Sequence, residues 1–524
     1  MRCCLAIVAV VIVSNPVAFS ADRPEGRAFA TRSVTYARNG LVSAAHPLAV
    51  QVGIDMLKAG GSAVDAAIAV NAALGFLEPT ANGLGGDLFA IVWDPKTEKL
   101  YGLNASGRAP ASLTIDKVPP EEDGTVPVYS VYSWTVPGCA DGWFELHEKF
   151  GNLPMEDVLR PAAEGEVFAN PALAHTLDRL AVGGRDAFYR GEIAEQIVAF
   201  SDEVGGFFSR QDFANHTTEW VEPISTTYRG VTVWELPPNP QGLAALQMLN
   251  ILEGFDLAAM GRDSTDFWHV MVEAKKLAYE DRARYYADMQ FAEVPVDALL
   301  DKEYATERAK LIDMKRAART LEPGNPALDH GDTTFLATAD GSGMLVSLIQ
   351  SNYTGFESGY VVPNVGIGIQ DRGALFSLDP AHPNALEPGK RPFHTIIPAF
   401  MGWTGVPDTA FGLMGGAMQP QGHVQIVVNL VDFGMNLQEA GDAPRFNHGG
   451  SSQPTGTVMT SGGILRIEKG LPPEVYRDLA KRGHRIQETN PVVFGGYQIV
   501  HRDPETGVLS GATESRKDGM AAGY

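Results

Sequence analysis

The chain has 524 residues, of which 44% are hydrophobic and 20% charged, and its 41 basic and 63 acidic side chains give a formal net charge of −22. This is ordinary globular composition, which excludes wholesale disorder and collagen-like repeats. The acidic balance and the absence of a Lys/Arg-rich run argue against nucleic acid as a main partner.

The first twenty residues have the pattern of an export leader. Arg2 precedes a continuously apolar run at 5–13 that is too short to span a bilayer, and Ala18 and Ser20 supply small residues before a cleavage site. We expect residues 1–20 to be a signal peptide and the mature chain to be periplasmic or secreted, without stable membrane insertion. An uncleaved anchor or a buried strand is the alternative. The mature chain keeps only Cys139, which we expect to be a buried, small apolar side chain.

The first structured block runs from residue 44 to residue 94. Apolar residues at helical spacing predict a helix over 48–57, which the glycine pair at 60–61 ends. Ser62 and Asp65 have capping-box spacing and open an Ala-rich helix to about Leu77. A strand at 88–93 follows the glycines at 83–86, which favour a tight turn or close packing over ligand contact. GLGGDL does not match GxGxxG, so no dinucleotide fold is indicated.

The middle of the chain has a mostly helical pattern, with predicted helices over 243–252 and, after the cap at Ser264, over 267–278. From Phe335 onward, short strands are predicted at 335–338, 344–349 and 360–362. The segment 321–331 (LEPGNPALDHG) has no periodicity and is predicted to be an exposed loop. Asp332, Thr333 and Thr334 stand directly after it, and by themselves two threonines at the start of a strand indicate only β-propensity.

Familiar catalytic motifs are missing from the sequence. The twelve histidines form no HExxH or HxxxH motif and have no cysteine partners, so we expect no metal and no other cofactor. GxSxG and the P-loop are also absent. A glycosidase carboxylate pair stays open, because an acidic chain offers many candidates.

Seven segments resemble the γ-glutamyltransferase family and stand in that family's order. They are AHPLA (45–49), GIDMLKAGGSAVDAAIA (53–69), EPTANGLGGDLFAIVWD (78–94), HVMVEAKKLAYEDRARYYAD (269–288), GDTT (331–334), GGAMQPQGHVQIVVNLVDFGMN (415–436) and EAGDAPRF (439–446). The resemblance implies an α+β fold of the N-terminal-nucleophile hydrolase type, an αββα sandwich of two stacked sheets between helical layers. It also implies a proenzyme that cuts itself before a threonine.

In this sequence the peptide bond that corresponds to the family's self-cleavage site is Asp332–Thr333. Cleavage would divide one interleaved folding unit into a large subunit, 21–332, and a small catalytic subunit, 333–524, which stay together as a heterodimer. The resemblance makes Thr333 the nucleophile, and its newly freed α-amine the base, since an amine of pKa about 7.7–8.0 works near neutrality. Thr334 would point to the opposite face of the strand and be structural. Gly415 and Gly416 match the glycine pair whose backbone N–H groups stabilise the oxyanion.

The substrate-binding columns depart from the family's pattern. Arg108 lies two residues after Ser106, which stands where the family usually has its substrate-binding arginine. His394-Thr395 stands where the family usually has a Ser-Ser pair. Leu375 stands where the family usually has the aspartate that binds the α-amino group of the glutamyl substrate. The candidate substrate-binding residues implied by these columns and their neighbours are Arg108, Asn352, Asp371, Arg372, His394 and Thr395.

The resemblance implies cleavage of γ-glutamyl amides such as glutathione, by hydrolysis or by transfer to an amine, through a threonine acyl-enzyme. The alternative is a γ-glutamyltransferase-like amidohydrolase or acylase acting on glutaryl-, cephalosporin- or oxamate-type amides. The pocket residues alone favour this alternative, because a substrate ammonium facing Leu375 would lose its carboxylate partner. A second alternative is a non-catalytic exported relative that binds small ligands.

Overall fold

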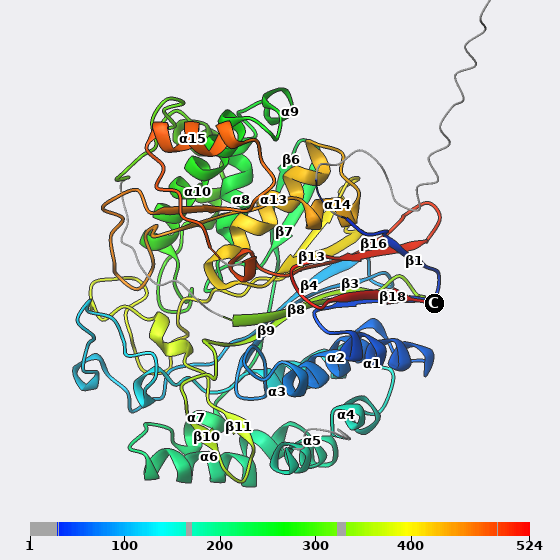
Figure 1. Cartoon of the computed structure of the whole chain (residues 1–524). Coiled ribbons are helices and arrows are strands. Elements are labelled where there is room, and N and C mark those ends of the chain that lie inside the picture. Colours follow the sequence, from blue (N-terminus) through cyan, green and yellow to red (C-terminus); the bar gives the residue numbers. More distant parts are fainter. Residues whose placement is uncertain (1–28, 30, 164–169, 322–331, 490) are drawn as a thin grey trace, which may run out of the picture.

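The computed structural model describes residues 29, 31–163, 170–321, 332–489 and 491–524 (Figure 1). The predicted signal peptide and residues 322–331 of the predicted loop lie outside the described residues. Within the described ranges, no helix combines the length and the apolar character that crossing a membrane requires.

Two seven-stranded antiparallel sheets form the centre of the molecule. The first contains, in spatial order, β1 (Thr35–Ala37), β17 (Leu509–Thr513), β16 (Tyr497–Arg502), β13 (Thr409–Leu413), β12 (Ala399–Gly402), β7 (Val231–Glu235) and β6 (Ile224–Tyr228). The second contains β18 (Met520–Gly523), β2 (Gly40–Ala44), β8 (Asp332–Asp340), β9 (Leu345–Tyr353), β3 (Asp87–Asp94), β4 (Lys99–Ala105) and β5 (Glu219–Val221). Two hairpins stand apart, β10 (Val361–Val362) with β11 (Ile367–Gly368) and β14 (Phe446–Gly449) with β15 (Ile464–Ile467).

Helices cover the outer face of each sheet (Figure 1). The second sheet is covered by α1 (Pro47–Lys58), α2 (Ala63–Leu77) and α3 (Cys139–Phe150), with α4 (Met155–Ala163), α5 (Pro171–Tyr189), α6 (Glu192–Glu203) and α7 (Arg210–Ala214) beyond them. On the side of the first sheet lie α8 (Gly242–Leu252), α9 (Leu257–Met260), α10 (Thr265–Tyr285), α11 (Val296–Leu300), α12 (Lys302–Ala309), α13 (Gln419–Val431), α14 (Leu437–Asp442) and α15 (Pro473–Arg482).

The two sheets pack face to face through an apolar layer. Phe89 and Phe335 of the second sheet belong to the same buried cluster as Phe400 and Val500 of the first. Two larger buried clusters lie on the outer sides, one between each sheet and the helices that cover it. The predicted αββα sandwich is therefore confirmed.

Local signals account for many element boundaries. The capping box between Ser62 and Asp65 opens α2, and the Ser264 side chain caps α10, both as predicted.

Cys139 is buried, as expected, and burial raises the pKa of its thiol well above the ordinary value. The mostly helical interpretation of the middle of the chain was incomplete, because it missed the strands β5, β6 and β7.

The glycines at 83–86 serve close packing, as predicted. A Cβ atom on Gly85 would lie 1.7 Å from the carbonyl oxygen of Gly368, and one on Gly86 would lie 2.2 Å from Oδ1 of Asn352. The turn is thereby pressed against the β9 end and the β10–β11 hairpin, beside the start of β3.

We predict that Gly85→Ala destabilises the protein by about 1–3 kcal/mol, because the added methyl group meets backbone that cannot rotate away. Gly75→Ala is the matched control, since a Cβ there meets its nearest atom at 3.5 Å, an ordinary contact. Thermal unfolding followed by circular dichroism measures both. Equal midpoints for the two variants would contradict the close packing at Gly85.

Candidate active site

Thr333 lies at an irregularity in the pairing of β8 with β9. The register passes from Asp332 opposite Tyr353 to Thr334 opposite Gln350, so Thr333 faces two residues of β9. This is the geometry of a β-bulge, which redirects a side chain locally. Thr333 is buried and its Oγ1 donates to Oγ of Ser351 over 3.3 Å.

Thr334 contacts a different part of the molecule. Its Oγ1 donates to Oε2 of Glu78, the residue that caps the C-terminus of α2, over 3.1 Å. The two threonines thus hydrogen-bond to different elements, and Thr334 ties β8 to α2. This agrees with the structural role that the sequence predicted for it.

A chain of hydrogen bonds leads from Thr333 into the protein. Oγ of Ser351 accepts from Nη2 of Arg372 over 2.8 Å, and Nη1 of Arg372 donates to Oγ1 of Thr395 over 2.8 Å. The Arg372 guanidinium also lies 4.6 Å from the ring centroid of Tyr353. Thr333, Arg372 and Thr395, all candidate site residues in the sequence, are therefore brought together. Ser351 links them and was missed.

The charges of Asp87 and Asp371 act on Arg372 from a distance, without forming an ion pair with it. The side chain is fully buried, and burial lowers the pKa of its guanidinium to about 10. It makes no ion pair with any residue that the structure describes, and its Nε has no hydrogen-bond partner there. A buried cation that faces hydroxyl groups and an aromatic ring, with no paired anion, is energetically costly.

Asp371 and Asn352 hold the segment that follows β9. Both carboxylate oxygens of Asp371 accept from Thr354, one from its backbone N–H and one from its hydroxyl. Nδ2 of Asn352 donates to the carboxylate of Glu357. Burial raises the pKa of Asp371 to about 7 and, together with the charge of Asp371, that of Glu357 to about 8. These carboxyl groups are thus committed to positioning residues 354–357.

Two other predicted residues have partners elsewhere. The Arg108 guanidinium lies 2.7 Å from Glu219 and 3.6 Å from Asp288. Nε2 of His394 lies 3.0 Å from Oδ2 of Asp87, and burial lowers the pKa of that imidazole well below its ordinary value. Neither side chain has a hydrogen bond to Thr333, Ser351 or Arg372 among the described residues, although the charge of Arg372 acts on His394, and neither residue lines the cavity described below.

A cavity of about 410 Å³ is lined by Tyr353, whose ring lies against the Arg372 guanidinium, whereas Thr333, Ser351, Arg372 and Thr395 are not among its described lining residues. Gly415 lines it and has a φ of 125°, while Gly416 has a φ of 57°, a backbone region that favours glycine. Nε2 of Gln241 donates to the carbonyl oxygen of Gly416 over 2.9 Å and fixes the turn before η4 (Gly416–Met418). The other lining residues are Val128, Tyr129, Lys275, Tyr353, Thr354, Gly355, Met414, Ala417, Met418, Gln421, Asn447, His448, Gly449, Gly450, Gln453, Arg466, Val493, Gly495 and Lys517.

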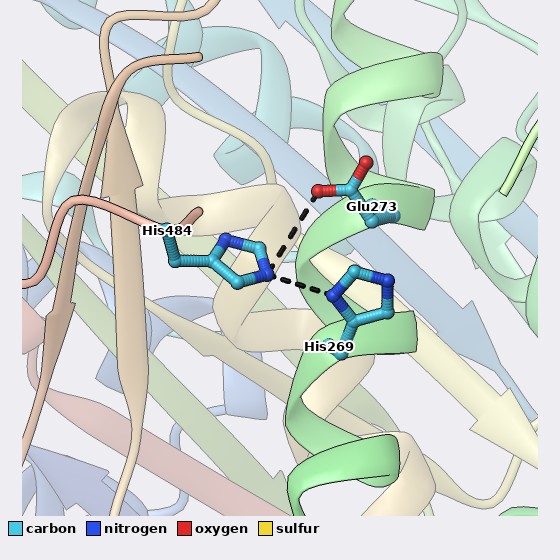
Figure 2. Close-up of side chains that lie close together, drawn as sticks. All are labelled: His269, Glu273 and His484. Atoms are coloured by element: carbon cyan, nitrogen blue, oxygen red, sulfur yellow. Dashed lines mark hydrogen bonds and ion pairs between the residues drawn. The ribbon is translucent and has the colours of Figure 1, made fainter. Parts of the chain in front are cut away.

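The fold also assembles a cluster that motif spacing did not predict. His269 and Glu273 lie one turn apart on α10, and His484 follows α15 (Figure 2). The two imidazoles contact each other over 2.8 Å through Nδ1 of His269 and Nε2 of His484. Oε1 of Glu273 accepts from the ammonium of Lys276 over 2.7 Å, and this charge opposes binding of a divalent cation. The cluster ties α15 to α10.

The γ-glutamyltranspeptidase family model matches residues 49–164 and 162–524. The chain belongs to this family. It is 34% identical to the glutathione hydrolase-like YwrD proenzyme of Bacillus subtilis, over 92% of this chain and 98% of that protein. It is 32% identical to the oxamate amidohydrolase proenzyme of Klebsiella pneumoniae, over 93% and 98%. The crystal structure of cephalosporin acylase from Bacillus halodurans superimposes with a TM-score of 0.86 at 43% identity, covering 98% of this chain and 99% of that one.

These matches confirm the family and the N-terminal-nucleophile hydrolase fold that the sequence predicted. The three relatives are a glutathione hydrolase-like protein, an oxamate amidohydrolase and a cephalosporin acylase, so the family's common chemistry is amide hydrolysis with differing acyl groups. Family membership alone therefore leaves the acyl group of this chain to be inferred from its own pocket.

We predict that Glu357→Gln increases stability at alkaline pH. A carboxyl group whose folded pKa, about 8, exceeds its ordinary 4.5 holds its proton more tightly when folded, so the wild type loses stability as pH rises through this window. Glutamine cannot ionise and keeps an acceptor for Asn352. The difference in unfolding midpoint between variant and wild type should widen from about pH 5 to about pH 9.

The exposed Glu121 supplies the control, because Glu121→Gln should leave that difference independent of pH. Parallel pH slopes for wild type and Glu357→Gln would mean that the carboxyl group is not held protonated.

Proposed function

We propose that the protein is an autoprocessed amidase whose nucleophile is Thr333 and whose acyl substrates end in a carboxylate and lack the glutamyl α-amino group. The observation that carries this proposal is the buried Arg372 cation, which makes no ion pair with a described residue and lies two hydrogen bonds from the Thr333 hydroxyl. The amidohydrolase or acylase alternative thus ranks above γ-glutamyl transfer.

Processing creates the catalyst. Water cleaves the Asp332–Thr333 peptide bond and yields two chains, up to Asp332 and from Thr333, the second beginning with a free amine. That amine takes the proton of the Thr333 hydroxyl as the oxygen attacks the substrate carbonyl, and the backbone N–H groups of Gly415 and Gly416 stabilise the oxyanion. The amine then gives the proton to the departing leaving group. Water hydrolyses the resulting ester, which releases the acid and restores Thr333.

Arg372 would hold the carboxylate of the acyl group. In the uncut chain Asp332 pairs with Tyr353, whose ring lies against the Arg372 guanidinium. Departure of Asp332 after cleavage would open this side of the nucleophile to substrate. A carboxylate arriving there completes a buried ion pair, with the hydroxyls of Ser351 and Thr395 as further hydrogen-bond partners.

An α-amino group would have no anionic partner. Both oxygens of Asp371 are engaged by Thr354, and Leu375 is packed in the apolar core between the first sheet and its helices. A desolvated ammonium without a carboxylate costs several kcal/mol. This favours des-amino acyl groups, in line with the acylase and oxamate amidohydrolase among the relatives.

The cleavage prediction separates an enzyme from a ligand-binding relative. Purified wild type should give two bands on a denaturing gel, Thr333→Ser should also give two because a hydroxyl is retained, and Thr333→Ala should give one. An N-terminal sequence beginning at Thr333 would locate the cut. A single band from the wild type, under conditions in which it is folded, would contradict the proposal.

The acyl-group prediction uses three anilides on the processed protein: γ-glutamyl, glutaryl and butyryl. The glutaryl compound lacks only the amino group, and we expect its kcat/KM to exceed that of the γ-glutamyl compound by about tenfold or more. Arg372→Met should lower kcat/KM for the glutaryl anilide by about tenfold or more relative to the butyryl anilide, which has no carboxylate. Arg372→Lys, which keeps the charge, should partly restore the preference.

A displaced Ser351 would lower kcat/KM for the butyryl anilide as well. The comparison of the two anilides therefore isolates the contribution of the substrate carboxylate. A wild-type preference for the γ-glutamyl compound, or an equal loss for both acyl groups in Arg372→Met, would overturn the assignment.

A further inference from the structure

Asp87, the aspartate of the GLGGDL segment, is a fully buried carboxyl group that the proposed reaction does not use. It is the first residue of β3 and pairs directly with Ser351 of β9. Side chains that stand opposite each other in an antiparallel pair lie on the same face of the sheet. Asp87 is therefore on the face from which Ser351 contacts Arg372.

Both carboxylate oxygens of Asp87 are engaged by neutral groups. Oδ1 accepts from the backbone N–H of Gly107 and from Nε2 of Gln370, each over 2.8 Å. Oδ2 lies 3.0 Å from Nε2 of His394. Because Nδ1 of that imidazole accepts from the backbone N–H of Ile396, the ring proton lies on Nε2 and is donated to Asp87.

The segments that hold Asp87 also hold Arg372. Gln370 precedes Arg372 by two residues, and His394 directly precedes Thr395, which accepts from Nη1 of Arg372. A buried anion and a buried cation are thus held near each other with neutral groups between them. The charge of Asp87 partly offsets that of Arg372, although the two form no ion pair.

Arg372 is the neighbour of Asp87 whose charge has no ion-pair partner among the described residues. The titratable side chains that face Asp87 from the elements packed around it are Cys139, Arg372, Arg391 and His394. Burial keeps the thiol and the imidazole neutral, and Arg391 lies 2.7 Å from Glu219. The local charge balance therefore rests on Asp87 and Arg372.

A substrate carboxylate at Arg372 would place two anions beside one buried cation. Such an arrangement is costly unless one anion is neutralised. The substrate carboxyl, with an ordinary pKa of about 4.3, stays ionised near neutrality. Burial raises the pKa of Asp87 to about 6, against the opposing hydrogen bond from Gln370 and the charge of Arg372. Asp87 is thus ionised at pH 7 but can be protonated by a second nearby anion.

We propose that Asp87 is a positioning residue that acts through Arg372: it balances the arginine's charge before substrate binds and becomes protonated when the acyl carboxylate arrives. The inference rests on the proposed function, in which Arg372 holds that carboxylate. The proton comes from solvent. The Asp87–His394 pair then has one hydrogen between Oδ2 and Nε2 and another on Nδ1, so the pair titrates as a unit. Binding consumes a proton and weakens as pH rises above about 6.

Calorimetry measures the proton uptake. Glutarate, the acid that the glutaryl anilide would release, is titrated into processed wild type at pH 7 in PIPES and in imidazole, two buffers with different ionisation enthalpies. We expect uptake of about half a proton or more per glutarate bound, because Asp87 is mostly ionised beforehand. Asp87→Asn should take up about 0.2 proton or less, since asparagine cannot ionise. It keeps an acceptor for Gly107 and Gln370 and supplies a donor to His394.

The kinetic test compares the glutaryl and butyryl anilides from about pH 5.5 to about pH 7.5. Taking the ratio of their kcat/KM values removes the titration of the Thr333 amine, which affects both compounds. In the wild type this ratio should fall by about fivefold or more as pH rises, because ionised Asp87 opposes the substrate carboxylate. In Asp87→Asn it should stay within about twofold.

Asp94→Asn is the matched control. It removes the same charge from the other end of β3, about 23 Å away for a strand of this length. This variant should keep the proton uptake and the pH dependence of the wild type.

The outcomes separate this inference from the proposed function. Glutarate that binds to wild type without proton uptake would overturn the role of Asp87 and leave that of Arg372 standing. The same holds for a ratio whose pH dependence is equal in wild type and Asp87→Asn, which would assign the titration to Asp371. Failure of the wild type to bind glutarate, or binding that Arg372→Met leaves unchanged, would overturn both.

Discussion

The hydrogen bond between Thr333 and Ser351 is the contact on which the rest of the site depends. It exists because β8 and β9 are out of register by one residue at their shared end, and this bulge directs the Thr333 hydroxyl toward Ser351. Beyond the bulge the two strands pair regularly through the centre of the second sheet. The proposed nucleophile is thus followed directly by a regularly paired strand, and the bond proposed for self-cleavage lies at the start of that strand.

The buried charges around the candidate site bear on the anionic substrate that we propose for this acidic protein. Burial raises the pKa of Asp371 to about 7 and, together with the charge of Asp371, that of Glu357 to about 8, which weakens the negative charge of both carboxyls near neutral pH. The cations there are treated differently. Arg372 is buried beside hydroxyl groups, and Lys275 beside neutral acceptors.

Local sequence signals predicted the helices that have side-chain caps and the strands that follow Thr333. Ser62 with Asp65 and Ser264 are examples, because a cap depends on residues three apart. The strands β6 and β7 were missed, since they alternate polar and apolar residues at the edge of the first sheet and lie in a segment of helical neighbours. Ser351 was missed because its role depends on pairing between two strands, which no local pattern encodes. Its position opposite the predicted nucleophile on the next strand was the available signal.

Arg108 and Arg372 show more clearly that local sequence patterns do not identify the residues of the site. Arg108 stood nearest to the family's expected position, but its charge is satisfied by Glu219, more than a hundred residues away in sequence. Arg372 had no motif of its own, yet the fold places it without an ion pair in the described structure and within two hydrogen bonds of Thr333. We therefore propose that the cation that lacks an internal ion pair is the one that binds substrate. This criterion is a property of the folded chain rather than of any segment.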